Sequence, residues 1–194
     1  MPLNHTSQYA ELTDEQFRLV GQLVVEWSNI EFLLGVLLGR LLLTPEFLSR
    51  VYTDEMSASR VQEAIKKAIE IHTHRYGFRV VPSEILDAIV KLNTDIEKFR
   101  SLRNRFSHFC WFRSTDEEIF GSGLSGFVPR NKRVDKDSMK ISVTELRDIY
   151  RNAYQLVERL SGVIQKLPET DEGESLTTAS TRTGFSAGAP KHAG

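Results

Sequence analysis

Four long stretches of the chain carry apolar side chains at the three- and four-residue spacing of an α-helix, and no other feature limits the fold as strongly. They are predicted to begin after the N-cap Thr13, around Ser57, after the cap Ser83, and at Ser142 or Thr144. A shorter helix is expected at 46–51, directly after a proline that permits a first turn. The pattern therefore predicts an all-α protein, an antiparallel bundle of about four long helices plus one short helix.

The first of these helices is expected to be largely buried, because two apolar rows make its stripe wide. The rows are Val20, Val24, Trp27, Glu31, Leu34, Leu38 and Leu41, and Leu23, Ile30, Leu33 and Leu37. Glu31 is the exception, and a carboxylate on an apolar face is costly unless it is paired. One hypothesis pairs Glu31 with Arg103 or Asn104 across the bundle, and the alternative leaves it in water at the edge of the stripe. Gly35 and Gly39 in the same helix are expected where another helix of a soluble protein packs closely.

The rest of the chain divides around this bundle. Residues 1–12 form an N-terminal extension, 13–167 the helical domain, and 168–194 a tail that is expected to be disordered because it is rich in Ser, Thr, Gly and Ala. A small loop or hairpin insertion is predicted before the last helix. Its strands are expected at Trp111–Ser114 and Phe127–Arg130.

Composition excludes some classes of function. The net charge of -1 is unlike that of a globally basic nucleic-acid binder, although it leaves room for a local basic patch. A single cysteine, Cys110, cannot form an intrachain disulfide or a cysteine-based zinc cluster. The most apolar run, 30–43, contains two charged residues and is shorter than the roughly 20 residues that cross a bilayer. We therefore expect a soluble, cytoplasmic protein that does not insert into a membrane.

Chemically useful side chains gather at the end of the third long helix, in the stretch 101–111 (SLRNRFSHFCW). Histidine side chains in general titrate near neutrality and can move a proton, which makes His108 a candidate acid or base. The planar fork of Arg103 matches phosphate oxygens, and Asn104 can hold the arginine or lock the imidazole tautomer. No carboxylate lies among these three, so no metal or other cofactor is implied. The trio suits RNA cleavage, in which a base activates the ribose 2′-OH and a cation steadies the charge that develops on the phosphate.

The spacing of these residues limits how one copy of the chain can use them. Asn104 and His108 are four apart and share a helix face, as do Arg103 and Ser107. Arg103 and His108 are five apart, so their directions diverge by roughly 140°. Either the arginine bends round, or the helix end is distorted, or two copies combine. A two-fold dimer would place two Arg/His pairs around one cleft.

Positive charge surrounds this cluster. Between Glu97 and Arg113 five basic residues face a single acid, with aromatic residues among them. Basic groups interleaved with aromatic rings suit single-stranded RNA. The candidates for RNA binding are Arg100, Arg105, Arg113 and Trp111. The alternative is that most of these aromatic residues belong to the core.

The stretch from Arg103 to His108 (RNRFSH) resembles the motif of the HEPN superfamily, an arginine and a polar residue followed by three variable residues and a histidine. An early helix with the residues 26–31 (EWSNIE) and a closing helix resemble the layout of that superfamily over roughly 13–167. The resemblance implies a metal-independent endoribonuclease, acting as a toxin or in antiviral defence, and a homodimer with a composite cleft. It implies Arg103 and His108 as catalytic residues and Asn104 as their polar helper; Ser107 and Glu31 are the supporting residues of the prediction.

RNA and a second copy of the chain are the expected partners, and an antitoxin or another protein is a further expected partner. Other HEPN domains are inactive and serve in binding or assembly, which is the alternative function, with the Arg/His cluster as a structural clasp.

Overall fold

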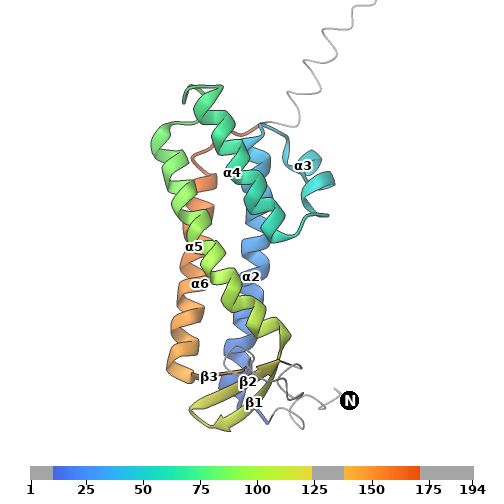
Figure 1. Ribbon diagram of the computed structural model, residues 1–194, viewed down its shortest axis with the longest axis vertical. Helices are drawn as coiled ribbons and strands as arrows, with labels where there is room; N and C mark the ends of the chain where they lie inside the picture. The colour runs from blue at the N-terminus through green and yellow to red at the C-terminus, as the bar shows by residue number, and fades with distance from the viewer. Residues whose placement is uncertain (1–10, 124–137, 171–194) are drawn as a thin grey trace, which may run out of the picture.

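The computed structural model describes residues 11–123 and 138–170. Five helices and three strands lie in these ranges: α2 (Asp14–Leu41), α3 (Glu46–Thr53), α4 (Ala58–His74), α5 (Ser83–His108), β1 (Phe109–Thr115), β2 (Glu118–Gly123), β3 (Ser138–Ser142) and α6 (Val143–Ile164). The helices form an elongated bundle, and the strands lie together at one end of it (Figure 1). The predicted helices are confirmed, with boundaries that differ by a few residues.

The bundle is only partly antiparallel. The start of α2 lies beside the β1–β2 turn, because Gln16 Nε2 donates to the carbonyl oxygens of Thr115 and Asp116 at 2.9 and 3.0 Å. The end of α5 and the start of α6 lie at the same end of the molecule (Figure 1). At the other end, the ring of His72 near the end of α4 is 2.7 Å from the carbonyl oxygen of Leu41 at the end of α2. α5 therefore runs antiparallel to α2, α4 and α6, which share one direction because α3 returns the chain before α4 begins.

The insertion before the last helix is a three-stranded antiparallel sheet, so the all-α prediction is not accurate. β1 contains the predicted strand at 111–114, but it pairs with β2, and β2 pairs with β3. The other predicted strand, Phe127–Arg130, lies outside the described residues. Gly121 in β2 lies opposite Trp111, and a Cβ there would come within 2.6 Å of the Trp111 ring. The glycine therefore allows the Trp111 ring to approach the backbone of β2 closely, whereas from the sequence alone a glycine suggests that the strand is interrupted.

Capping boxes begin two of the helices, α2 and α6. The Thr13 hydroxyl accepts from the Gln16 backbone N–H, and the Gln16 side chain accepts from the Thr13 N–H. Ser142 and Glu145 form the same arrangement at the start of α6, so Ser142 rather than Thr144 is the cap. α5 differs from its prediction, because Pro82 is its N-cap and Ser83 its first residue.

The buried face of α2 takes in both of its predicted apolar rows. Leu23, Ile30 and Leu37 of one row and Trp27, Leu34 and Leu38 of the other are almost completely buried, whereas Val24 is 52% exposed. Val24 and Glu31 are seven residues apart and so lie on one side of the helix, at the outer edge of the buried face. Glu31 is exposed, as the alternative interpretation expected.

α3 packs on the C-terminal half of α2 at its two glycines. A Cβ at Gly39 would lie 2.6 Å from Ser49 Oγ, and one at Gly35 would lie 3.3 Å from Thr53 Oγ1. This confirms that the small residues of α2 allow a close helix contact. α2 is also the one helix, among the described residues, that is long and apolar enough to cross a membrane by length and composition alone. Its residues Trp27, Ile30 and Leu34 lie in the core of the bundle, an arrangement compatible with a soluble protein.

Candidate functional site

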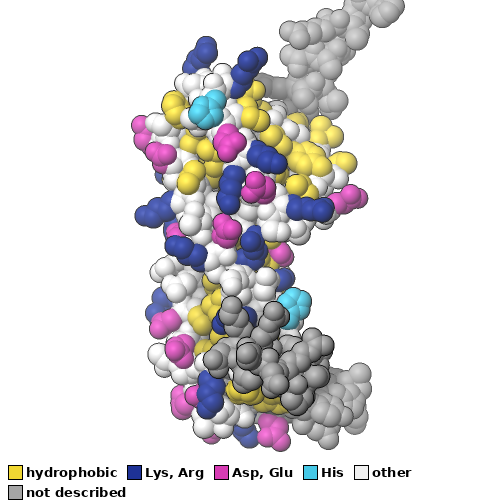
Figure 2. All heavy atoms as spheres, viewed as in Figure 1, with side chains coloured by type: hydrophobic (Ala, Val, Ile, Leu, Met, Phe, Trp, Pro, Cys, Tyr) yellow, Lys and Arg dark blue, Asp and Glu magenta, His cyan; other side chains and the backbone are white. Residues whose placement is uncertain are grey.

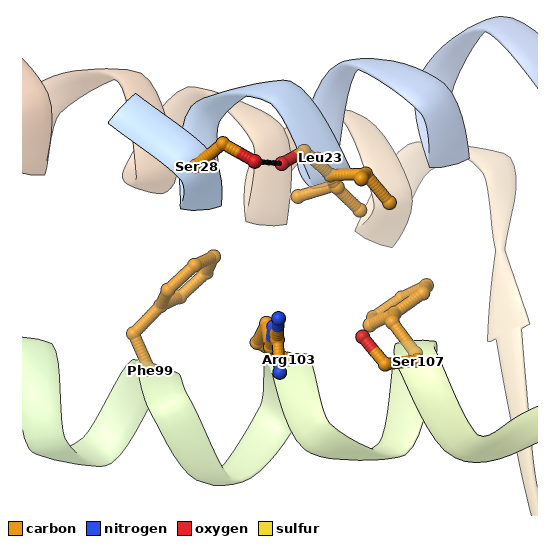
Figure 3. A pocket seen from close by; sticks show the side chains of 7 residues that line it. Leu23, Ser28, Phe99, Arg103 and Ser107 are labelled. Carbon is orange, nitrogen blue, oxygen red and sulfur yellow. Dashed lines mark hydrogen bonds between the residues drawn. The ribbon is translucent and has the colours of Figure 1, made fainter. Parts of the chain in front are cut away.

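A small pocket lies between α2 and α5, at the end of the bundle where the sheet begins. Its lining consists of Leu23, Val24, Ser28, Phe99, Arg103, Phe106 and Ser107. Figure 3 shows that Phe99, Arg103 and Ser107 follow one another along the face of α5 that is turned toward α2. Their four-residue spacing puts them on that face. The cavity measures about 30 Å³, which holds on the order of two water molecules.

Arg103 brings positive charge to a mostly apolar surface. Its side chain is half-buried, and its guanidinium carbon lies 5.2 Å from the centre of the Trp27 ring, in a cation–π contact. Its Nη1 donates to Asn104 Oδ1 over 3.4 Å. Within the described residues no ion pair joins Arg103 to a carboxylate. An arginine that is partly removed from water and has no acidic partner attracts an anion more strongly than an exposed one.

The other residues of the motif face water. Asn104, Ser107 and His108 are all exposed, and His108 is the last residue of α5. Ser107 lines the pocket beside Arg103, whereas Asn104 and His108 are not among its lining residues. One copy of the chain therefore does not enclose Arg103 and His108 in the same pocket. This agrees with the divergence that their five-residue spacing predicts.

The sheet fixes the end of α5 and so the position of His108. The helix passes into β1 without a loop, because Phe109 has an extended backbone (φ −90°, ψ 142°). The indole Nε1–H of Trp111 donates to the Phe106 carbonyl oxygen at 3.0 Å, and their rings stack with centroids 4.8 Å apart. That bond satisfies one of the carbonyl groups that a helix end leaves open. Trp111 therefore has a structural role, which the alternative interpretation of the aromatic residues expected.

The predicted RNA-binding arginines have different surroundings. Arg100 is half-buried, donates to Gln62 Oε1 at 2.6 Å and so joins α5 to α4. Arg113 is exposed and forms ion pairs with Asp116 at 3.4 Å and Glu11 at 3.9 Å. Arg105 is exposed on the last turn of α5. Arg105 thus offers the most accessible charge of the three.

The proposed pairing of Glu31 across the bundle is wrong within one copy. Among the described residues no hydrogen bond or ion pair links Glu31 to Arg103 or Asn104. The pairing followed from placing Glu31 on the buried stripe, and the exposure of Glu31 at the edge of that stripe removes the premise. Trp27, one turn earlier, is the residue of α2 that contacts Arg103. The sequence offered one indication of this contact, because Trp27 lies on the same apolar row as Glu31.

Within 11–123 and 138–170, no three His, Cys, Asp or Glu side chains come together in a group that could hold a metal ion. No family model, curated protein or solved structure matches the chain. The resemblance to HEPN proteins therefore rests on the motif and its surroundings in the sequence.

Proposed function

We propose that this protein is a metal-independent endoribonuclease of the HEPN type, acting in the cytoplasm as a toxin or in antiviral defence. The observation that carries the proposal is the environment of Arg103. It lines a pocket without a carboxylate partner in the described residues, and the exposed His108 follows it five residues later on α5. A cation that can bind a phosphate and a solvent-accessible imidazole are the two groups that 2′-OH attack requires.

The proposed reaction needs no group beyond these side chains, the RNA and water. His108 takes the proton of a ribose 2′-OH, whose oxygen bonds to the adjacent phosphorus. The bond from phosphorus to the 5′-oxygen breaks, and that oxygen receives a proton from water. Arg103 holds the phosphate oxygens on which charge accumulates, and Asn104 steadies its guanidinium. The products are a 2′,3′-cyclic phosphate and a 5′-hydroxyl.

The site is proposed to be completed by a second copy of the chain. The pocket beside Arg103 is too small for a nucleotide, and His108 lies outside its lining. Next to it, α2 exposes the apolar residues Val24 (52%), Val25 (58%) and Phe32 (50%). An isologous contact over this face would bury them and bring two motifs to one cleft.

Complementation between inactive variants tests both parts of the proposal. Arg103→Ala and His108→Ala are each expected to abolish RNA cleavage in EDTA while they leave the fold intact. If each site takes its arginine from one copy and its histidine from the other, a mixture of the two variants regains about a quarter of the wild-type activity, because half of the dimers are mixed and each has one intact site. An active wild type whose two variants stay inactive when mixed would place the whole site within one copy.

A binding or assembly module is the second candidate function, and one surface favours it. Hydrophobic side chains gather over α3, at the upper right of the space-filling view (Figure 2). Phe47, Leu48 and Val51 are 75%, 60% and 75% exposed, and Arg50 lies over the Phe32 ring at 3.9 Å. Exposed apolar patches mark protein interaction sites. Under this function, wild type and His108→Ala would be equally inactive on RNA, and Leu48→Asp would abolish binding of the partner.

A further inference from the structure

A second cleft lies on the other side of α2, between that helix and α6, away from the Arg103 pocket. Its volume is about 310 Å³, which is within the size range of ligand sites. The lining consists of Arg18, Leu19, Arg147, Tyr150, Arg151 and Tyr154. Three arginines and two tyrosines thus surround a floor formed by the buried Leu19. No carboxylate is among the described residues that line the cleft.

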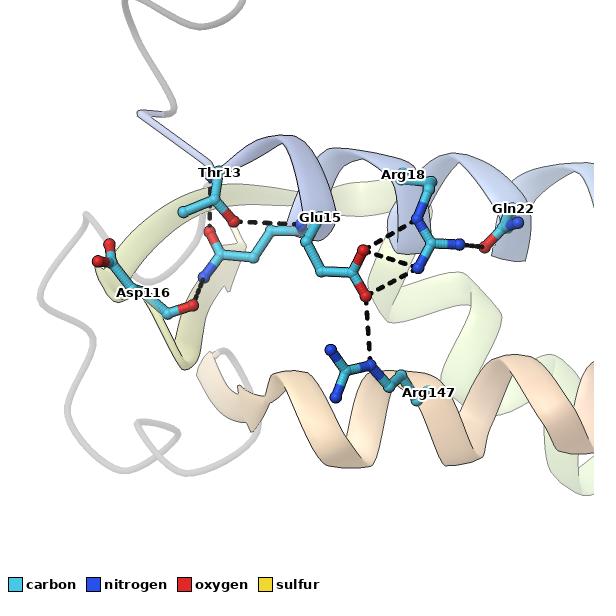
Figure 4. A network of polar contacts seen from close by, with 7 residues as sticks. Thr13, Glu15, Arg18, Gln22, Asp116 and Arg147 are labelled. Atoms are coloured by element: carbon cyan, nitrogen blue, oxygen red, sulfur yellow. Dashed lines mark hydrogen bonds and ion pairs between the residues drawn. The ribbon is translucent and has the colours of Figure 1, made fainter.

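The arginines of this cleft are held in place by neighbouring carboxylates. Glu15 accepts from Arg18 at 2.7 and 2.8 Å and from Arg147 Nε at 3.2 Å, a network drawn in Figure 4. Hydrogen bonding to Arg18, and then to Arg147, lowers the pKa of the Glu15 carboxyl. The carboxylate therefore stays ionised and keeps both guanidinium groups oriented. Arg151 is oriented in the same way by Asp148, which accepts from its Nη1 at 2.8 Å.

These ion pairs leave some of the N–H donors of Arg147 and Arg151 unused. Arg147 binds Glu15 through Nε, and within the described residues its two Nη groups donate to no acceptor. Arg151 binds Asp148 through Nη1, and its Nε and Nη2 are likewise without an acceptor there. The side chains of Arg147 and Arg151 are 52% and 66% exposed. Each can therefore donate to a phosphate without giving up its present carboxylate partner.

Aromatic surface lies next to these donors. Tyr154 is 47% exposed, and it follows Arg147 and Arg151 at helical spacing along α6. Positive groups that follow a phosphate backbone, combined with rings on which bases stack, form the usual surface for single-stranded nucleic acid. A purely acidic partner would use the arginines and leave the tyrosine without a role.

We propose that the α2–α6 cleft is a binding site for single-stranded RNA outside the bond that is cleaved. Arg147 and Arg151 bind two phosphates, and Tyr154, which follows them along α6, stacks on a neighbouring base. Arg18 and Leu19 line this cleft and Leu23 and Val24 line the Arg103 pocket, so the two sites occupy neighbouring turns of α2. The choice of RNA as the ligand rests on the proposed function.

Fluorescence anisotropy with a labelled 2′-O-methyl RNA, which cannot be cleaved by 2′-OH attack, tests the site in the full-length protein. Each phosphate contact of a single strand contributes about 0.7 to the slope of log affinity against log salt, so Arg147→Gln with Arg151→Gln is expected to flatten the slope by about 1.4. Tyr154→Ala is expected to weaken binding about fivefold, the lower end for a stacked base, without a change in slope. Arg159→Gln is the matched control, because Arg159 is an exposed arginine of α6 that pairs with Asp95 outside the cleft, and binding is expected to stay within twofold. Circular dichroism checks that all variants are folded.

Three results would overturn the proposal. The first is an unchanged slope in the double variant, and the second is unchanged affinity in Tyr154→Ala. The third is binding of a poly-glutamate peptide that competes with the RNA and needs both arginines but not the tyrosine, which would identify a surface for an acidic protein.

Failure of the cleft and failure of the proposed function give different results. If the wild type cleaves RNA in EDTA and the cleft variants bind and cleave as it does, the cleft inference is wrong and the proposed function stands. If the cleft variants lose RNA binding and the wild type never cleaves, the catalytic function is wrong and the cleft stands.

Discussion

The contact between α2 and α3 gives the sharpest test of the packing. Replacing Gly39 by alanine places a Cβ 2.6 Å from Ser49 Oγ and 2.8 Å from Ser49 Cβ, so α3 must move. Gly21 lies in the same helix, and a Cβ there would meet nothing within 4 Å. Both changes gain helix propensity, by about 0.5–1 kcal/mol. Only Gly39→Ala also overfills a packed contact, which costs about 1–3 kcal/mol. Because the propensity gain cancels between the two variants, Gly39→Ala is expected to be about 1–3 kcal/mol less stable than Gly21→Ala.

Urea unfolding followed by circular dichroism measures this difference. Gly35→Ala, whose Cβ would come to 3.3 Å from Thr53 Oγ1, is expected to lie between the other two variants. Ser49→Gly removes the atoms that clash with a Cβ at residue 39, so a double-mutant cycle between the two positions should show a favourable coupling. Equal stability of Gly39→Ala and Gly21→Ala, with no coupling to Ser49, would refute the close contact of α3 on α2.

Two further predictions concern carboxylates. Glu31→Gln is expected to leave the free energy of unfolding unchanged within about 0.5 kcal/mol, because the side chain is exposed; a large loss in thermal denaturation would indicate a buried partner. The pKa of Glu15 is lower in the folded protein than its ordinary value, because two arginines hydrogen-bond to it. Its carboxylate therefore stabilises the fold above the ordinary glutamate range, and this contribution is lost as pH falls through the lowered pKa. Melting temperatures are expected to be lower for Glu15→Gln than for wild type at pH 7 and equal in strong acid; a gap that persists in acid would contradict this.

The helical stripes were sufficient to predict that the helices exist, but not every cap, as Pro82 at the start of α5 shows, nor the rotation of each helix about its axis. In α2 the two apolar rows are adjacent, and packing against α6, α4 and α5 buries residues of both, Ile30 of one and Trp27 and Leu34 of the other. This arrangement leaves Glu31 in water at the edge of the buried face and brings Trp27 into contact with Arg103. Periodicity gives the width of an apolar face, whereas its centre depends on the neighbouring helices.

The sheet and the roles of the basic residues depend on long-range contacts. In the sequence Gly121 suggests an interruption of the strand, whereas in the fold the absence of a side chain there makes room for the Trp111 ring. In the sequence Arg100 is one of several neighbouring basic residues, and its hydrogen bond to Gln62 of α4 could not be predicted from that pattern. The residues of the candidate site around Arg103 could be grouped in advance because they follow one another along one helix. The α2–α6 cleft could not be identified in this way, since Arg18 and Arg147 are far apart in the sequence. Only folding brings both of them to the same partner, Glu15.

The most direct test of the central claim is the chemistry of the cleaved ends. A labelled single-stranded RNA is incubated with the wild type and with His108→Ala in excess EDTA, and the products are analysed by mass spectrometry. The wild type alone is expected to produce fragments that end in a 2′,3′-cyclic phosphate, and 2′-O-methylation at the cleaved nucleotide is expected to block the reaction. Equal cleavage by His108→Ala, no cleavage by either protein, or fragments that end in a simple phosphate with a free 2′-hydroxyl from the outset would contradict it.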